Sequence, residues 1–241
     1  MRKVWVIGHV AEDVVLKLKS DLVIVNFHLT TEVFNRCGGS TSNIAIGIAS
    51  GPVETAFITY LGNDDAAEFV EPVLQNSNFN PLLITRGDQG TPRCLVVVDE
   101  FGERTLMLLS KIVKDHGGIT LKHAGIKSGD IVLFTHWNEE WRTEIDYARE
   151  QGCTIVIGIG ALLAEPKVSA DIAIGSISDI PRELPFEDYL DRFPLIVVTR
   201  GLTGSTLYAK SGKVHQDAFP VNTIDTTGAG DSFLAGFLTG Y

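Results

Sequence analysis

The residues best suited to chemistry lie near the carboxyl end of the chain, in the string DTTGAGDSF at positions 225–233. The apolar pattern that follows predicts a helix, so the backbone amides of Gly228, Ala229 and Gly230 would stand at its N-terminus, where a phosphate can bind. Asp231 would lie in the first helical turn, beside that anion. A carboxylate there would repel a phosphate unless it had a task, and we predict that it accepts a proton from a hydroxyl group attacking the phosphoryl group. The alternative interpretation is a capped helix start whose glycines allow close packing.

A second string, GGSTSNIA at positions 38–45, also opens a predicted helix. Its two glycines would let the backbone approach a ligand, and the Asn43 amide can both donate to and accept from a hydroxyl group. Alone, this string indicates little, because two glycines before a capped helix usually form only a turn.

Together, the strings at 38–45 and 225–233 resemble the N- and C-terminal signatures of the ribokinase-like (PfkB-type) sugar kinases. The resemblance implies that Asp231 is the catalytic base and that the amides of residues 228–230 hold the charge developing on the phosphoryl group. It also implies a substrate-binding set formed by Asp13, Gly39 and Asn43 at the ends of the early strands. For Asp13 the alternative is a solvated acid at a strand end.

The same resemblance implies a nucleotide site, because TRGLTG at 199–204 looks like the family's Thr-x-Gly-x-x-Gly element. The implied ATP-binding residues are Thr199, Gly201, Gly204 and Thr227. Magnesium is expected with the nucleotide. Asp179 is the candidate to hold it through water, standing where the family's Asn-x-x-Glu element has its glutamate, with Ser176 in place of the asparagine. A monovalent cation is a further candidate cofactor.

Other nucleotide-binding signatures are missing from the sequence. It contains no Gly-x-x-x-x-Gly-Lys-Ser/Thr loop and none of the protein-kinase motifs, so phosphate binding must use the helix terminus. The string GIGALL at 158–163 lacks the third glycine of the dinucleotide fingerprint. A nucleotide-dependent oxidoreductase is therefore disfavoured.

Short apolar runs alternate with amphipathic stretches along the chain, as in a parallel α/β sheet. The predicted strands span residues 4–7, 55–60, 131–135, 154–157, 172–174 and 195–199, and the clearest predicted helices span 42–50, 65–75 and 139–151. The pattern predicts an α/β three-layer sandwich with a mostly parallel central sheet, and the resemblance makes it ribokinase-like. In such folds ligands bind at the carboxyl ends of the strands.

Two β-like regions, 13–34 and 94–109, interrupt this alternation, and the second contains a hairpin turn at Asp99–Gly102. We predict a single domain over 1–241, with a small β-sheet lid built from insertions at 14–33 and 91–110. The lid would close over the site and exclude water, since ATP hydrolysis is the competing reaction. Because family members often pair through their lids, the expected assembly is a homodimer.

Composition excludes several other classes of protein. Thirty acidic against twenty basic residues give a formal net charge of -10, and the basic residues are scattered, which disfavours nucleic acid as a partner. The longest apolar stretch, 153–164, is shorter than the roughly 20 residues that span a bilayer, and the N-terminus does not read as a secretion signal. Three scattered cysteines indicate a reduced, cytoplasmic protein without structural zinc.

The function predicted on these grounds is transfer of the γ-phosphoryl group of ATP to a hydroxymethyl group of a small sugar, polyol or nucleoside. The alternative is a sugar- or nucleotide-binding regulatory protein on the same fold, with weak or no kinase activity. Family members usually continue for several tens of residues beyond the catalytic aspartate, whereas this sequence stops at Tyr241. Both a naturally short chain and a fragment remain open, as does the identity of the substrate.

Overall fold

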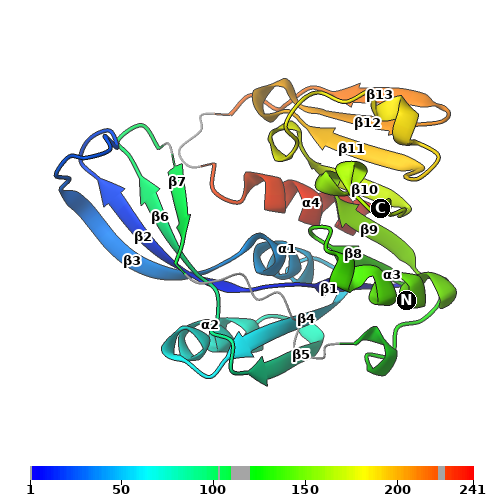
Figure 1. The fold of residues 1–241 in the computed structure, drawn as a ribbon, viewed down its shortest axis with the longest axis horizontal. Helices are drawn as coiled ribbons and strands as arrows, with labels where there is room; N and C mark the ends of the chain where they lie inside the picture. The colour runs from blue at the N-terminus through cyan, green and yellow to red at the C-terminus, as the bar shows by residue number, and fades with distance from the viewer. Residues whose placement is uncertain (1, 103, 110–119, 222–225) are drawn as a thin grey trace.

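The computed structural model describes residues 2–102, 104–109, 120–221 and 226–241. Its largest element is a nine-stranded sheet in the order β13-β12-β11-β10-β9-β8-β1-β4-β5 (Figure 1). The strands are β1 (Lys3–Ile7), β4 (Glu54–Gly62), β5 (Phe79–Gly87), β8 (Ile131–Phe134), β9 (Thr154–Gly158), β10 (Ile172–Ser176), β11 (Leu195–Thr199), β12 (Ser205–Ala209) and β13 (Gly212–Gln216). All neighbours are parallel except β11 with β12 and β12 with β13.

The central strands are apolar on both faces because both faces are covered. In β1, Val4 and Val6 belong to one core cluster, whereas Trp5 and Ile7 belong to the other. Side chains alternate along a strand, so each cluster fills one side of the sheet. Burying one such side chain contributes roughly 1.5–3 kcal/mol. The result is the predicted three-layer sandwich, and this part of the interpretation is confirmed.

Four α-helices pack on this sheet: α1 (Ser40–Ala49), α2 (Asp65–Gln75), α3 (Arg142–Glu150) and α4 (Ala229–Gly240). Apolar residues of α1, α2 and α4 join one core cluster, and those of α3 join the other. Single 3-10 turns occupy Leu121–His123, Glu139–Trp141, Ile159–Leu163, Ile177–Asp179, Phe186–Tyr189 and Gly201–Thr203. No helix in the described ranges is long and apolar enough to cross a bilayer.

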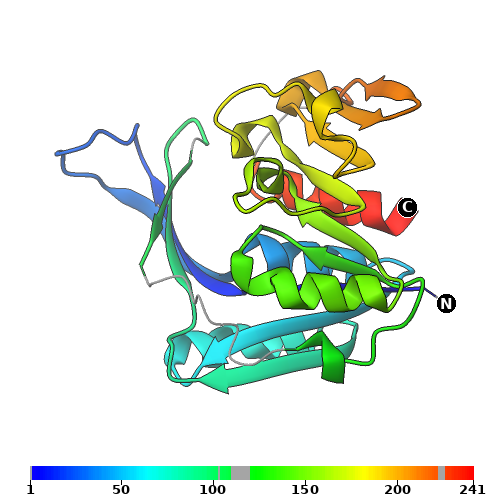
Figure 2. The same ribbon diagram turned by 45° about the vertical axis from the view of Figure 1, so that its right-hand side comes forward.

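A separate four-stranded sheet, here called the lid, stands beside the central sheet (Figures 1 and 2). Its strands are β2 (Ala11–Leu18), β3 (Thr30–Gly38), β6 (Arg93–Val98) and β7 (Arg104–Leu108), in the order β3-β2-β6-β7. The lid strands begin and end outside the predicted insertion 14–33, because β2 follows β1 almost directly. Residues 103 and 110 of the predicted insertion 91–110 lie outside the described residues.

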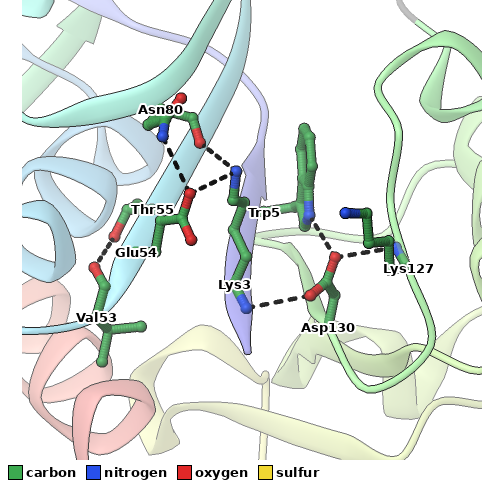
Figure 3. A network of polar contacts seen from close by, with 8 residues as sticks. All are labelled: Lys3, Trp5, Val53, Glu54, Thr55, Asn80, Lys127 and Asp130. Atoms are coloured by element: carbon green, nitrogen blue, oxygen red, sulfur yellow. Dashed lines mark hydrogen bonds and ion pairs between the residues drawn. The ribbon is translucent and has the colours of Figure 1, made fainter. Parts of the chain in front are cut away.

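A buried acid links the amino-terminal part of β1 to the segment before β8 (Figure 3). Asp130 accepts hydrogen bonds from the Lys3 amide, the Trp5 Nε1 and the Lys127 amide, at 3.1, 3.0 and 2.9 Å. Because a buried carboxylate is costly without partners, these three donors make its burial possible. The network therefore holds the amino-terminal end of β1 in place.

Three strands of the central sheet were not predicted from the sequence. β5 contains Pro81 and lies at the sheet edge, the position in which a strand tolerates proline. β12 and β13 form an antiparallel hairpin at the other edge, and β13 is exposed along its whole length. The predicted helix 139–151 is also divided, into a 3-10 turn and α3.

Candidate active site

A cavity of about 500 Å³ opens at the carboxyl ends of β8 to β11. Its lining is rich in polar and small residues, and the five that matter most here are Gly158, Ser176, Asp179, Thr199 and Asp231. Four of them come from the strand ends and the turns that follow, and Asp231 comes from α4. This is the edge where ligands bind in open α/β sheets.

The start of α4 forms one wall of this cavity. Its N-cap is Gly228, which has a φ of 72°, a conformation that favours glycine. The first helical hydrogen bond runs from the Ser232 amide to the Gly228 carbonyl at 2.8 Å, and the Ala229 amide donates to the Thr226 carbonyl at 3.1 Å. The turn therefore already uses one of the three predicted anion-binding amides. Gly230 lines the cavity, and a Cβ there would meet open space.

Asp231 lies against Asn43, which was predicted only as a substrate ligand. Asn43 Nδ2 donates to Asp231 Oδ2 at 2.9 Å, joining two residues 188 positions apart in the sequence. One turn further along each helix, a Cβ added to Gly47 would come within 2.9 Å of the Ala235 Cβ. The small residues let α1 and α4 pack closely side by side (Figures 1 and 2), and this packing brings Asn43 to Asp231.

Asp13 lies in β2 and is only 7% exposed. Arg36, its cross-strand partner in β3, reaches Asp13 Oδ2 with both Nε and Nη2 at 3.3 Å. Burial raises the pKa of Asp13, Arg36 lowers it, and the negative charge of Asp231 raises it further. The two carboxylates therefore lie within electrostatic range of each other. A Cβ at Gly38 would lie 2.2 Å from the Asp13 carboxyl group, so this glycine makes room for the acid.

The predicted nucleotide residues fall into two places. Thr199 ends β11 and lines the 500 Å³ cavity, and Gly201 and Gly204 lie in the turn that follows. Gly204 has a φ of 94°, and a Cβ there would lie 2.0 Å from the Gln216 carbonyl oxygen. Beside this turn is a second cavity of about 440 Å³ lined by Leu202, Ala218, Phe219, Pro220 and Val221.

Thr227, the fourth predicted nucleotide residue, does not join them. It lines a third cavity, of about 290 Å³, on the inner surface of the lid. We call this the lid cavity; its wall residues include Val15, Lys17, Phe34, Val96, Val98 and Phe101. Thr227 directly precedes Gly228, so the lid cavity and the start of α4 are adjacent.

Asp179 faces the 500 Å³ cavity and also caps a turn. Its Oδ2 accepts the Ser176 amide at 2.7 Å, while Ser176 Oγ accepts the Ser178 amide at 3.2 Å. Within the described ranges, no group of three His, Cys, Asp or Glu side chains is placed to hold a metal ion. A single carboxylate beside the predicted phosphate-binding residues is compatible with Mg²⁺, which keeps several waters and binds through one or two carboxylates plus substrate phosphates.

Comparison with known proteins shows to which family this chain belongs. The family model for pfkB family carbohydrate kinases matches residues 1–159 and 190–241. The chain belongs to this family. Three of its predicted site segments, around Asp13, Asn43 and Asp231, lie within the matched residues of this PfkB kinase.

Curated relatives of this PfkB kinase act on different acceptors. It is 26% identical over 215 residues to the ATP-dependent ribose-1-phosphate kinase of Halopiger xanaduensis, covering 83% of this chain and 72% of that protein. It is 24% identical over 258 residues to the nucleoside kinase of Methanocaldococcus jannaschii, covering 100% and 84%. The family thus establishes a carbohydrate or nucleoside kinase, without the individual substrate.

Solved structures show the same fold. A microbiome-derived acarbose kinase superposes with a TM-score of 0.84 at 21% identity, covering all of this chain and 86% of that one. The ribokinase of Thermotoga maritima gives a TM-score of 0.76 at 20% identity, covering 99% and 85%. The lid and the parallel sheet of this PfkB kinase are therefore arranged as in the ribokinase fold.

Three further residues belong to the surroundings of the site, and sequence reasoning missed one of them, Arg36. Arg36 precedes the GG string but has no motif of its own, and only the β2–β3 register places it on Asp13. Arg104 Nη2 of the lid donates to Thr226 Oγ1 at 3.2 Å, a contact between segments 122 residues apart. His136 lines the 500 Å³ cavity, and burial lowers its pKa. Arg104, in the predicted lid, and His136, just after the predicted strand 131–135, were candidate substrate contacts from the sequence, with a surface or packing role as the alternative. Arg36 has no local sequence signal beyond its residue type.

Proposed function

We propose that this protein transfers the γ-phosphoryl group of ATP to a hydroxymethyl group of a small sugar, polyol or nucleoside. The observation that carries the proposal is the position of Asp231. Its carboxylate lines the cavity at the strand ends, accepts a hydrogen bond from Asn43 and lies within electrostatic range of the buried Asp13. This position supports Asp231 as the base, with the cavity proposed for the phosphates on one side and Asp13 proposed for the acceptor hydroxyl groups on the other.

In the proposed reaction, the acceptor oxygen attacks the γ-phosphorus and its proton passes to a carboxylate oxygen of Asp231. The new bond joins that oxygen to phosphorus, and the bond from phosphorus to the β–γ bridging oxygen breaks, which leaves ADP. The Asn43 amide holds the carboxylate by donating to Oδ2. Because the Ala229 amide already donates to the Thr226 carbonyl, the proposed donors to the transferred group are the amides of Gly228 and Gly230 at the positive end of the α4 dipole.

Asp13, Gly39 and Asn43 are the proposed acceptor-binding residues. Asp13 Oδ2 is held by Arg36, and the remaining carboxylate oxygen can accept a hydrogen bond from an acceptor hydroxyl group. Gly39 lies at the carboxyl-terminal end of the lid, where β3 gives way to α1. This position brings its backbone beside Asn43 and the acceptor.

Thr199, Gly201 and Gly204 are the proposed ATP contacts beside the second cavity. Leu202, Phe219 and Val221 there are exposed, as expected for surfaces that receive the flat face of a base. Thr227, next to the phosphate-binding amides, is proposed to contact the terminal phosphate. Asp179 is the proposed carboxylate that holds magnesium through water. The magnesium ion would add positive charge that offsets the charge of the phosphates. A monovalent cation is retained as a further candidate.

The lid is proposed to act as one mobile part of a single domain over 1–241, formed from the insertions at 14–33 and 91–110. Its hairpin tip carries exposed apolar residues, among them Ile24, Val25 and Phe27. Such a patch favours contact with a second copy, so we propose a homodimer through the lids. We also propose a cytoplasmic location, from the three free cysteines.

The experiment that tests the function is measurement of ADP release with a panel of pentoses, hexoses, polyols and nucleosides, with mass spectrometry of the acceptor. A kinase gives ADP and an acceptor heavier by one phosphate in equal amounts. ADP without phosphorylated acceptor, or acceptor binding without ADP, would instead support the regulatory binding protein. Asp231→Asn is the matched control and should abolish most of the signal while leaving acceptor binding.

A further inference from the structure

The lid cavity has an ordered wall that the proposed reaction does not use. Cross-strand pairing places three rows of side chains on the lid surface that carries Asp13. Starting at the end of β2 nearest β1, the rows are Arg36–Asp13–Cys94–Leu108, Phe34–Val15–Val96–Leu106 and Glu32–Lys17–Val98–Arg104. The middle row is entirely apolar and contains one aromatic ring.

This wall continues the acceptor site rather than forming a separate one. Asp13 belongs to the first row, and its neighbour in that row, Arg36, lines the lid cavity. On the opposite side, Thr227 lines the same cavity and directly precedes the N-cap of α4. An acceptor whose hydroxyl group reaches Asp231 therefore has the apolar row beside the rest of its skeleton.

The charges around the lid cavity disfavour an acceptor that carries an anionic group there. Arg36 is paired with Asp13, and Lys17 Nζ lies 2.9 Å from Glu32 Oε2 and 5.6 Å from the Phe34 ring centroid. Two acidic residues, Asp99 and Glu100, also line this cavity. A phosphate or carboxylate on the acceptor would meet cations that already have acidic partners. A neutral ring would instead meet apolar side chains.

The aromatic side chains are placed to receive such a ring. Phe34 is 39% exposed and Phe101 is 73% exposed, and both line the lid cavity. Val15 and Val96, between the strands, are buried and give the cavity an apolar floor. A volume of about 290 Å³ is at the lower end of ligand pockets, which suits one small ring system rather than a second sugar chain.

We propose that the lid cavity binds a flat, uncharged ring carried by the acceptor on the side away from its reacting hydroxymethyl group. The acceptor class is then a nucleoside or a similar heteroaryl glycoside, and Phe34 determines this specificity. The inference rests on the proposed kinase function and narrows it. Asp13 and Asp231 select the hydroxyl groups, and the middle row of the lid selects the ring.

The test uses acceptors that share one hydroxymethyl group and differ only at the first carbon of ribose: ribose, ribose 1-phosphate, inosine and cytidine. We expect kcat/KM for inosine or cytidine at least 10-fold above that for either ribose or ribose 1-phosphate. Phe34→Ala should lower kcat/KM for the nucleosides about 5- to 150-fold, mainly through KM, as stacking energies imply. It should leave kcat/KM for ribose within about twofold.

Val33→Ala is the matched control, because Val33 is the neighbouring residue on the opposite face of β3 and is 59% exposed. This variant should leave kcat/KM unchanged for all four acceptors. Phe101→Ala, on a more exposed ring, provides a second variant if Phe34→Ala lowers the melting temperature. A preference for ribose or ribose 1-phosphate, or an equal loss for ribose and nucleosides in the Phe34 variant, would overturn the proposal.

Calorimetric titration with inosine and cytidine separates this proposal from the kinase function. If no acceptor yields ADP but inosine binds and Phe34→Ala weakens that binding 5-fold or more, the kinase proposal fails and the ring site stands. If ADP forms but neither inosine nor cytidine binds more tightly than ribose, the ring site fails and the kinase stands. Absence of binding of both inosine and cytidine in the wild-type protein overturns the ring site whatever the ADP assay shows.

Discussion

Replacing Asp231 with asparagine should lower the rate of phosphoryl transfer by roughly 10² to 10⁴, the range for a lost general base. The substitution keeps the size of the side chain but removes the charge and the ability to take a proton. At about 1.4 kcal/mol per tenfold, the loss corresponds to roughly 3 to 6 kcal/mol of activation free energy. Acceptor binding should change little, because Asp13 lies in β2 and Gly39 lies at the junction of β3 and α1, both outside α4.

Loss of the contact between Asn43 and Asp231 should lower the rate by a smaller factor than loss of Asp231 itself. The contact joins an amide donor to a carboxylate at 2.9 Å, and a hydrogen bond to a charged group is worth about 1.5–3 kcal/mol. Asn43→Ala should therefore lower the rate about 10- to 150-fold. If this contribution acts through the charge of Asp231, it disappears once the charge is gone. The double variant should then be slower than Asp231→Asn by less than about threefold.

The assay is ADP release at saturating ATP and acceptor, with the acceptor Kd of each variant measured by calorimetry. Thr239→Ala, about two turns further along α4, is the control and should leave the rate unchanged. Full turnover in Asp231→Asn would remove Asp231 from catalysis. If the fold loss in rate of the double variant equals the product of the two single losses, Asn43 acts on the acceptor independently of Asp231.

Three further predictions test other parts of the structure. Because burial raises the pKa of Asp13, its ionisation opposes folding as pH rises above the ordinary value of about 3.9. As the pH rises above that value, the free energy of unfolding of Asp13→Asn should therefore increase relative to that of the wild type, as measured by chemical denaturation. Calorimetry should show that the same variant binds the acceptor more weakly and binds ATP unchanged. Gly204→Ala places a Cβ against a backbone carbonyl, unlike Gly212→Ala, where no atom lies within 4 Å although φ is also positive. Urea unfolding should show Gly204→Ala less stable than Gly212→Ala by roughly 1–3 kcal/mol, with ATP affinity reduced only in the former. Asp130→Ala leaves the buried Trp5 Nε1 without its acceptor, which should lower the free energy of unfolding by about 1–3 kcal/mol and leave kcat unchanged.

The parts of the fold that the sequence predicts well are those whose signal is local. β11 is apolar on both faces because Ile196 and Val198 join one core cluster and Val197 joins the other, and its bounds agree with the predicted strand 195–199. α2 agrees with the predicted 65–75, since Asp64 caps its start by accepting the Ala67 amide at 2.9 Å. The edge strands β5 and β13 escape this reasoning. One contains a proline and the other is exposed throughout, so neither has the apolar run of a central strand.

Contacts of the site that depend on strand register could not be predicted. Arg36 reaches Asp13 because the two residues are directly opposite each other in β2 and β3. A shift of one residue in this pairing would turn Arg36 to the other face of the lid and leave Asp13 buried without a cation. The apolar row headed by Phe34 depends on the same register. The lid cavity is therefore a property of strand pairing, which no single segment of the sequence encodes.

The distance between Asn43 and Asp231 depends on how closely two helices pack. Each residue belongs to a recognisable motif, but their contact requires α1 and α4 to approach until Gly47 faces Ala235 one turn along. A side chain larger than hydrogen at position 47 would overlap the Ala235 Cβ and push the helices apart. Because a hydrogen bond weakens steeply as it lengthens, even a small separation would release the carboxylate. Residues that touch no ligand thus hold the proposed base in position, and this makes the catalytic geometry a consequence of core packing.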